Sequence, residues 1–461
     1  GLNQSASTTG GKMAKSPTVF QNGLHTLDTK PMSPRQRYAA VLVALGEFID
    51  GYDLLVIGGA LVLLKPQFQL SPAATGAVGA AGFLGAMVGL LVFGDMSDRL
   101  GRRAIFVANL VFFVVFSILS AFLTSVPQLL VVRFLVGIGI GMDIPTSTAY
   151  LAEIAPARHR GKVVGALTQI TWILGALAST LVALPLQSLF GDDAWRWMFG
   201  LAALPAALVL LGRQGLPESP RWLLAHGRVE EARAALASFG IEASGAELPI
   251  SERSGSWHEL FQPPVRRRVS WVSTIFFLNC LAGPIATVAA PYVIHTIGNF
   301  SLRTTFLFST MVWGTSLLGA IGSLLLIDRI GRKRLCYASL IPAGILALAM
   351  AATAGNNPIM LIGGYFAFSF FNWLGAPALQ WGWSSELFPT RLRGRGQGFC
   401  NAMCRLAISI NIFLVPVALA SIGFGRFVAL LSIPLFAYAL IVNRIDIFDS
   451  GGVSLETLEG R

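Results

Sequence analysis

The stretch RFLVGIGIGMDIPTSTAYLAEIAPARHRG, from Arg133 to Gly161, decides how the chain must fold. It is almost entirely apolar or small before Glu153, yet it contains Arg133 and Asp143. On a helix these two charges lie ~15 Å apart, and Asp143 and Glu153 a further ~15 Å apart. If Glu153 marks the membrane surface, Asp143 is near the middle of the bilayer. Charges at such depths need a partner or a polar cavity, so we expect a helix that lines a polar path. A buried ion pair that only joins helices is the alternative.

The composition is that of a polytopic membrane protein. Of 461 residues, 54% are hydrophobic and 12% are charged, about half the charged fraction of soluble domains. The net charge of +11 does not indicate nucleic acid, because the basic residues lie in short loops between apolar runs. The four cysteines, Cys280, Cys336, Cys400 and Cys404, show no ligand spacing. We expect no metal site, no disulfide framework and no cofactor, and the absence of common catalytic motifs argues against an enzyme.

Twelve apolar runs are long enough to cross a bilayer. They lie near residues 38–63, 73–94, 104–124, 127–151, 163–186, 196–212, 270–297, 303–327, 334–353, 357–384, 396–421 and 424–443. The sequence therefore predicts an all-α membrane protein with two six-helix bundles. Its expected parts are an N-terminal tail (1–36), a first bundle (37–212), a cytosolic helical linker (213–268), a second bundle (269–443) and a C-terminal tail (444–461).

Basic loops predict the orientation of these spans. DRLGRR, RHRGK, DRIGRKR and RLRGRG all fall on the side of the linker and both termini. The positive-inside rule then places the termini in the cytoplasm, with the protein in the plasma or inner membrane.

Two loop motifs recur at nearly one offset, which predicts two halves of the same orientation with a cavity between them. The residues that these motifs place at the cytosolic face are expected to form a charge network that closes this face in one state. They are Asp98, Arg102, Glu153 and Arg160 in the first half, and Asp328, Arg332, Glu386 and Arg393 in the second.

Several motifs carry a family resemblance. GDMSDRLGRR, from Gly94 to Arg103, resembles the loop signature of the major facilitator superfamily. AEIAPARHRG, PESPRWLL and SELFPTRLRG resemble the sugar-porter branch and its relatives. The resemblance covers 38–443 and implies a monomeric secondary transporter that works by alternating access. Its partners would be a small-molecule substrate, protons and the lipid bilayer.

The branch motifs point in two directions. Gly51-Tyr52-Asp53 resembles the proton-coupling site of sugar porters, in which the Asp pairs with an Arg at the position of Arg133. Gln169 resembles a sugar ligand of the same proteins. The seventh span, however, lacks the paired glutamines and the Asn that those proteins use on sugar hydroxyls, and Ala176 stands where a second Gln is expected.

Other motifs resemble anion carriers. GIGIGMDIPTSTAYLAE resembles the phosphate–proton symporters and the niacin-transporter group, and Arg405 stands where niacin, aromatic-acid and organic-anion carriers have an Arg. Asn279 stands where phosphate symporters have an Asp, which argues against inorganic phosphate. A guanidinium in the middle of a membrane helix can bind a carboxylate with two hydrogen bonds.

Asp53 is the expected proton carrier, because its protonation would release Arg133. Glu47 and Asp50 lie on the same broad stripe of the first helix and, with Asp143, are further candidates for proton coupling. Substrate contacts are expected from an intramembrane set, for which helix packing is the alternative: Arg405, Gln169, Asn279, Trp381, Trp383 and Tyr365.

The preferred prediction is a proton-coupled symporter that imports a small organic anion, such as an aromatic or other monocarboxylate. A proton-coupled sugar or polyol symporter is the alternative. A transporter of drugs or organic cations, with Glu47, Asp50 and Asp143 as cation ligands, comes next.

Overall fold

The computed structural model describes residues 27, 30–156, 167–241, 256–263, 265–353, 355–388 and 392–445, and every regular element in these ranges is a helix. The N-terminal half consists of α2 (Pro34–Gln67), α3 (Pro72–Leu100), α4 (Arg102–Ser120), α5 (Val126–Ile154), α6 (Thr168–Phe190), α7 (Ala194–Gly200) and α8 (Ala203–Arg213). The linker contains α9 (Pro220–Ala225), α10 (Val229–Ser238) and α11 (Trp257–Leu260). The C-terminal half consists of α12 (Val265–Ala282), the short η3 (Gly283–Ala286), α13 (Ala290–Gly298), α14 (Leu302–Ile330), α15 (Arg332–Ala352), α16 (Pro358–Leu374), α17 (Ala376–Glu386), α18 (Arg393–Ser421) and α19 (Phe424–Arg444).

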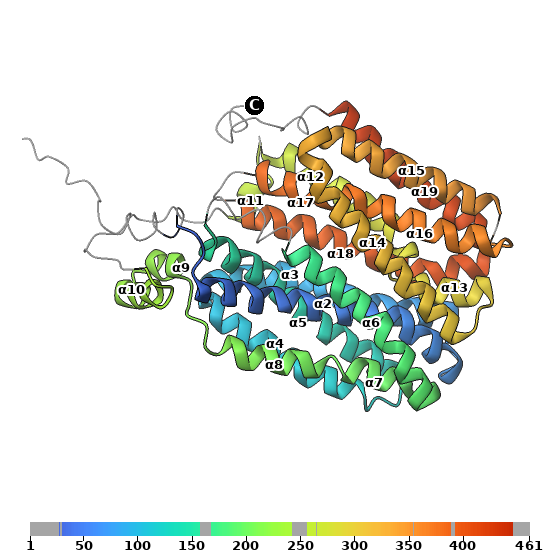
Figure 1. Cartoon of the computed structure of the whole chain (residues 1–461), viewed down its shortest axis with the longest axis horizontal. Coiled ribbons are helices and arrows are strands. Elements are labelled where there is room, and N and C mark those ends of the chain that lie inside the picture. The colour runs from blue at the N-terminus through green and yellow to red at the C-terminus, as the bar shows by residue number, and fades with distance from the viewer. Residues whose placement is uncertain are drawn as a thin grey trace, which may run out of the picture.

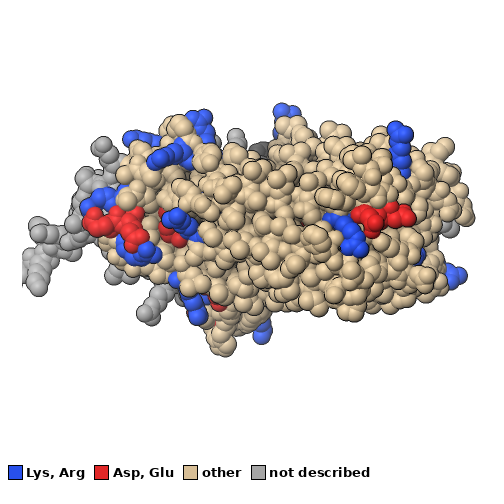
Figure 2. Space-filling model, turned by 90° about the horizontal axis from the view of Figure 1, so that it is seen from below, with Lys and Arg blue, Asp and Glu red and all other residues tan. Residues whose placement is uncertain are grey.

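These helices correspond to the twelve predicted spans. Ten stretches of the described helix have the length and apolar composition to cross a membrane, and one of them, Thr168–Arg213, covers two predicted spans. The twelfth is α2, whose interior carries three acidic residues. Figure 2 shows that the charged side chains on one face lie mostly toward the two ends of the long axis, with a broad uncharged band between them. This band fits the hydrocarbon core of a bilayer.

The two halves lie side by side, and the linker helices α9, α10 and α11 gather at one end (Figure 1), which we call the linker end. The opposite end is the far end. Within the N-terminal half, α3 packs on α5 and α2 packs on α6; between the halves, α18 packs on α3 and α14 packs on α6. Glycines permit this approach: a Cβ on Gly137 of α5 would meet the backbone oxygen of Gly82 on α3. Small residues of this kind are the usual means of close helix contact in membranes.

The seventh span is broken and the tenth bends sharply. Gly283-Pro284 ends α12 and starts η3, and Gly375 separates α16 from α17. A break leaves backbone carbonyls without their helical donors, which inside a membrane must be satisfied by protein. Side-chain donors contact carbonyls along this segment: Gln380 Nε2 lies 2.7 Å from the oxygen of Ile275, and Asn411 Nδ2 lies 2.7 Å from the oxygen of Leu281. The broken segment is therefore surrounded by amide side chains of α17 and α18.

Candidate substrate and proton site

Asp53 and Arg133 form the ion pair that the sequence predicted. Arg133 Nη1 lies 2.9 Å from Asp53 Oδ2, and Arg133 Nη2 donates to the backbone oxygen of Asp53 at 2.8 Å. The Asp53 carboxylate is fully buried and the Arg133 side chain is 2% exposed. The guanidinium also lies over the ring of Phe199, 4.7 Å from its centroid. The pair joins α2 to α5 inside the N-terminal half, shielded from solvent in this conformation.

Asp143 is paired with a residue that the sequence analysis missed. Arg213 Nη1, at the end of α8, lies 2.7 Å from Asp143 Oδ1, and both side chains are almost completely buried. The carboxylate also accepts hydrogen bonds from Asn109 at 2.6 Å and Ser147 at 2.9 Å. Arg213 donates further to backbone oxygens of α2, including that of Val43 at 2.9 Å. This geometry corresponds to the alternative weighed for Asp143, an ion pair that joins helices.

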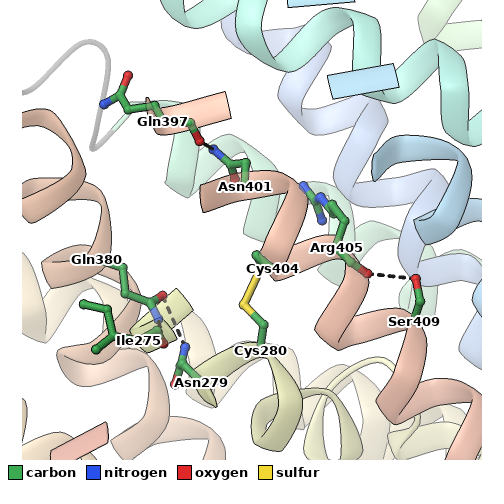
Figure 3. Close-up of a disulfide and its surroundings, with 9 residues drawn as sticks. All are labelled: Ile275, Asn279, Cys280, Gln380, Gln397, Asn401, Cys404, Arg405 and Ser409. Carbon is green, nitrogen blue, oxygen red and sulfur yellow. Dashed lines mark hydrogen bonds between the residues drawn. A yellow bond between two sulfur atoms is a disulfide. The ribbon is translucent and has the colours of Figure 1, made fainter. Parts of the chain in front are cut away.

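Glu47, Asp50 and Arg405 are buried without direct partners. They are 7%, 3% and 8% exposed, and among the described residues none of their side chains makes a hydrogen bond or an ion pair. The two acids lie on α2 and Arg405 on α18, yet both acids interact electrostatically with Arg405. Figure 3 shows the Arg405 side chain extending from α18 toward the helices of the N-terminal half. We call these three residues the unpaired charge cluster.

Neutral amides form a second group, around the broken seventh span. Asn279 Nδ2 contacts Gln380 Oε1 at 3.4 Å, while the Asn279 carbonyl oxygen has no hydrogen bond within the described chain. The carbonyl oxygens of Asn372 and Asn411 are also buried and without a hydrogen bond there. Figure 3 shows Asn279 and Gln380 on one side of α18 and Arg405 on the other. These three amide oxygens are hydrogen-bond acceptors, and the hydroxyl groups of a ligand could donate to them.

Three indoles meet across the two halves. Trp172 of α6 lies 5.9 Å, between ring centroids, from both Trp313 of α14 and Trp373 of α16. Trp381, predicted to contact substrate, is half-buried and packs edge-on against Phe276 at 6.1 Å.

The remaining predicted substrate residues differ in how far they are buried. Trp383 and Tyr365 are fully buried. Gln169 is half-buried on α6 and makes no hydrogen bond within the described chain.

Three of the predicted first-half gate residues, Asp98, Arg102 and Glu153, form a charge network at the linker end. Arg102 contacts Asp98 at 2.6 Å and Glu153 at 3.0 Å. Glu218, which the sequence analysis did not select, accepts the backbone N–H groups of Arg102 and Arg103 at 3.0 and 3.1 Å. Arg160 and the side chains of Asp328, Glu386 and Arg393 lie outside the described residues, and Arg332 is half-buried at the start of α15.

Contacts between the halves occur at both ends. At the linker end, Arg395 of α18 lies 3.0 Å from Asp95 of α3, a pair that the sequence analysis did not select. At the far end, Lys65 of α2 donates to the Tyr292 hydroxyl of α13 at 3.0 Å. A cavity of about 620 Å³ lies between α3, α5 and α18, but its lining is apolar, so it is separate from the charged and amide groups.

The expectation of no disulfide was wrong, because Cys280 and Cys404 form a disulfide that joins α12 to α18 (Figure 3). Cys336 and Cys400 are free and buried. The described residues hold no cluster of three or more His, Cys, Asp or Glu side chains able to bind a metal.

Comparison with known proteins assigns the chain to a family. The family described as sugar (and other) transporter matches residues 39–459. The inner membrane metabolite transport protein YgcS of Escherichia coli is 33% identical over 86% of this chain and 88% of its own length. The arabinose-proton symporter of Bacillus subtilis is 32% identical over 77% of this chain and 80% of its own length.

Solved structures agree on the fold. The inward-open xylose transporter XylE from E. coli aligns with a TM-score of 0.75 at 23% identity, covering 92% of this chain and 99% of that one. A second structure is titled as a major facilitator superfamily proton:xylose symporter and aligns with a TM-score of 0.73. The chain therefore has the major facilitator fold and belongs to the sugar (and other) transporter family, a family of multi-pass membrane transporters.

Proposed function

We propose that this protein is a proton-coupled symporter that carries a small polyhydroxylated metabolite across the membrane by alternating access. The observation that carries the proposal is the fully buried Asp53–Arg133 ion pair between α2 and α5. Two buried opposite charges stabilise each other, so protonation of the Asp53 carboxylate would remove the main attraction that holds α2 and α5 in this arrangement. The symporters among the relatives support the same coupling.

Proton binding would act through the geometry of this pair. A protonated Asp53 no longer balances the guanidinium, and Arg133 keeps only its bond to the Asp53 backbone oxygen and its contact with Phe199. The conformation that the ion pair stabilises then becomes less favourable relative to the conformation in which the two halves are arranged differently. The population shifts toward the second conformation. Substrate binding would shift the same population between the two arrangements, so the movement of the substrate and that of the proton would be coupled.

The linker end is proposed to face the cytoplasm, because the basic loops gather there. The network of Asp98, Arg102 and Glu153 would stabilise one position of the N-terminal half, and the Asp95–Arg395 contact would hold the two halves together at this end. Neither contact reaches the amide group, so their role is gating rather than recognition.

The amide group favours a sugar or polyol, the alternative given by the sequence, over the aromatic or other monocarboxylate that the sequence favoured first. Buried carbonyl oxygens of Asn279, Asn372 and Asn411 are acceptors, and sugar hydroxyls are donors. The named sugar carriers among the relatives support this alternative. Organic cations fit less well, because Arg405 and Arg213 add positive charge beside the acids.

Uptake into proteoliposomes with an imposed pH gradient tests the proposal. A labelled pentose or hexose should accumulate against its gradient, and Asp53→Asn should lose accumulation but retain exchange of sugar across the membrane. Asp192→Asn, at an exposed far-end position, is the matched control and should accumulate normally. Full accumulation by Asp53→Asn would remove this residue from proton coupling.

A further inference from the structure

The unpaired charge cluster is not explained by a neutral substrate. Arg405 is 8% exposed, and its Nε atom is buried without a hydrogen bond in the described part of the chain. One oxygen of Asp50 is in the same condition. A buried guanidinium and a nearby buried carboxylate normally form an ion pair, because burying either charge alone is unfavourable in a low-dielectric site. Here α18 and α2 hold them apart, within electrostatic range but without contact.

We infer that the site takes a polyhydroxylated carboxylate, a substrate of the sugar-acid class, whose carboxylate binds Arg405 in competition with Glu47 and Asp50. This inference rests on the proposed function, since it names the substrate of the same site. The amides around the broken seventh span would accept the hydroxyls. Asn411 lies six residues beyond Arg405 on α18, ~9 Å along the helix axis, which is comparable to the length of a six-carbon acid.

Charge balance links this substrate to protons. The other charged groups that face the cluster, Asp143 of α5 and Arg213 of α8, neutralise each other. When one of Glu47 and Asp50 is protonated, the remaining acid balances Arg405 and the site is neutral without substrate. When both are protonated, Arg405 is the only net charge, and a substrate carboxylate restores neutrality. Each bound carboxylate therefore brings a proton into the cluster, in keeping with the high energy of net charge inside a membrane.

Neither simpler substrate satisfies both groups. A neutral sugar would fill the amide acceptors but leave Arg405 without a carboxylate in direct contact. A carboxylate without hydroxyls would balance Arg405 but leave buried acceptors unsatisfied, which is unfavourable. A sugar acid supplies both a carboxylate for Arg405 and hydroxyl donors for the amide oxygens.

Matched ligand pairs test the inference on the full-length protein in lipid nanodiscs. D-Glucuronate and D-glucose differ only in the group at C6, as do D-galacturonate and D-galactose. Equilibrium binding is measured at about pH 5.5 and about pH 8, where the ligand carboxylate is ionised at both values. The acid of at least one pair should bind more tightly than its neutral partner at the lower pH and should weaken at the higher pH.

Variants assign the effect to the cluster. Arg405→Gln should reduce binding of the acid on the order of 10- to 100-fold, as expected for loss of charge-assisted hydrogen bonds, and should leave the neutral sugar unchanged. Glu47→Gln combined with Asp50→Asn should make acid binding independent of pH. Arg405→Lys keeps the charge and checks that the site still folds, and Arg426→Gln, on an exposed part of α19, is the control.

The outcomes separate the two proposals. If a neutral sugar binds and is accumulated with protons while its acid does not bind, the inference is overturned and the proposed function stands. If Arg405→Gln weakens acid and neutral sugar equally, the carboxylate assignment is overturned. If neither member of either pair binds, the inference is overturned, and the proposed function is decided separately by the accumulation assay with pentoses and other hexoses.

Discussion

The Asp143–Arg213 pair gives the sharpest test of whether a buried charge in this fold is structural. Arg213→Met would leave the Asp143 carboxylate with only Asn109 and Ser147 as donors. Loss of one partner from a buried pair destabilises a protein by about 3–5 kcal/mol. Asp143→Asn would be milder, by about 2–3 kcal/mol, because Arg213 keeps its carbonyl contacts on α2 and its position over Phe106, 4.5 Å from the ring centroid.

The double variant Asp143→Asn with Arg213→Met removes both charges, so we expect it to recover at least half of the stability that Arg213→Met loses. Unfolding is followed in detergent by intrinsic fluorescence against denaturant, and the coupling energy comes from the double-mutant cycle. Since every oxygen of Asp143 is already bonded, we also expect the double variant to accumulate substrate with protons. A double variant that is stable but no longer accumulates substrate would refute this reasoning and return Asp143 to the proton pathway.

Three further predictions concern contacts away from this pair. Gln380→Ala should destabilise the protein by about 0.5–1.5 kcal/mol, since the buried Ile275 carbonyl loses its side-chain donor. Gln380→Glu should not restore this stability in the same unfolding assay, because it lacks the amide donor. Asp95→Asn should shift the ratio of states open and closed at the linker end by up to about fivefold, as a half-exposed pair is worth about 1 kcal/mol; distances between spin labels on the two halves measure this ratio, and exchanging the charges of Asp95 and Arg395 should restore it. Alkylation of the denatured, unreduced protein should modify only two cysteines, and mass spectrometry showing modified Cys280 or Cys404 would contradict the disulfide.

The spans were predictable because twelve long apolar runs leave a membrane protein few other folds, and eleven of them lie in the ten described stretches that meet length and composition criteria. The Asp53–Arg133 pair was predictable because Gly51-Tyr52-Asp53 resembles the coupling site of sugar porters, and charges buried in membrane spans need a partner. Arg213 was missed because it is the last residue of its span. Its sequence position suggests the solvated linker, and only the packing of α8 against α2 and α4 shows that its side chain points back into the bundle.

The amide group was only partly predictable. Asn279 was selected as a polar residue in an apolar span, but Gln380 and Asn411 were not, although the same signal marks them. Asn411 meets the Leu281 carbonyl beside the break at Gly283-Pro284, and Gln380 meets the Ile275 carbonyl within α12. Gly-Pro indicates the break but not which side chains pack against it. The disulfide was missed because its cysteines lie 124 residues apart, and pairing at that distance depends on how α12 and α18 meet.

The Cys280–Cys404 bond has a mechanical consequence for how this protein opens. It staples the last turn of α12 to the middle of α18, whereas α13 begins only after the Gly283-Pro284 break. The disulfide therefore restrains the end of α12 to move together with α18, whereas α13, beyond the break, can move relative to both. A fluorophore placed on α13 would therefore report every opening of the far end, while the same dye on α12 would stay silent relative to α18.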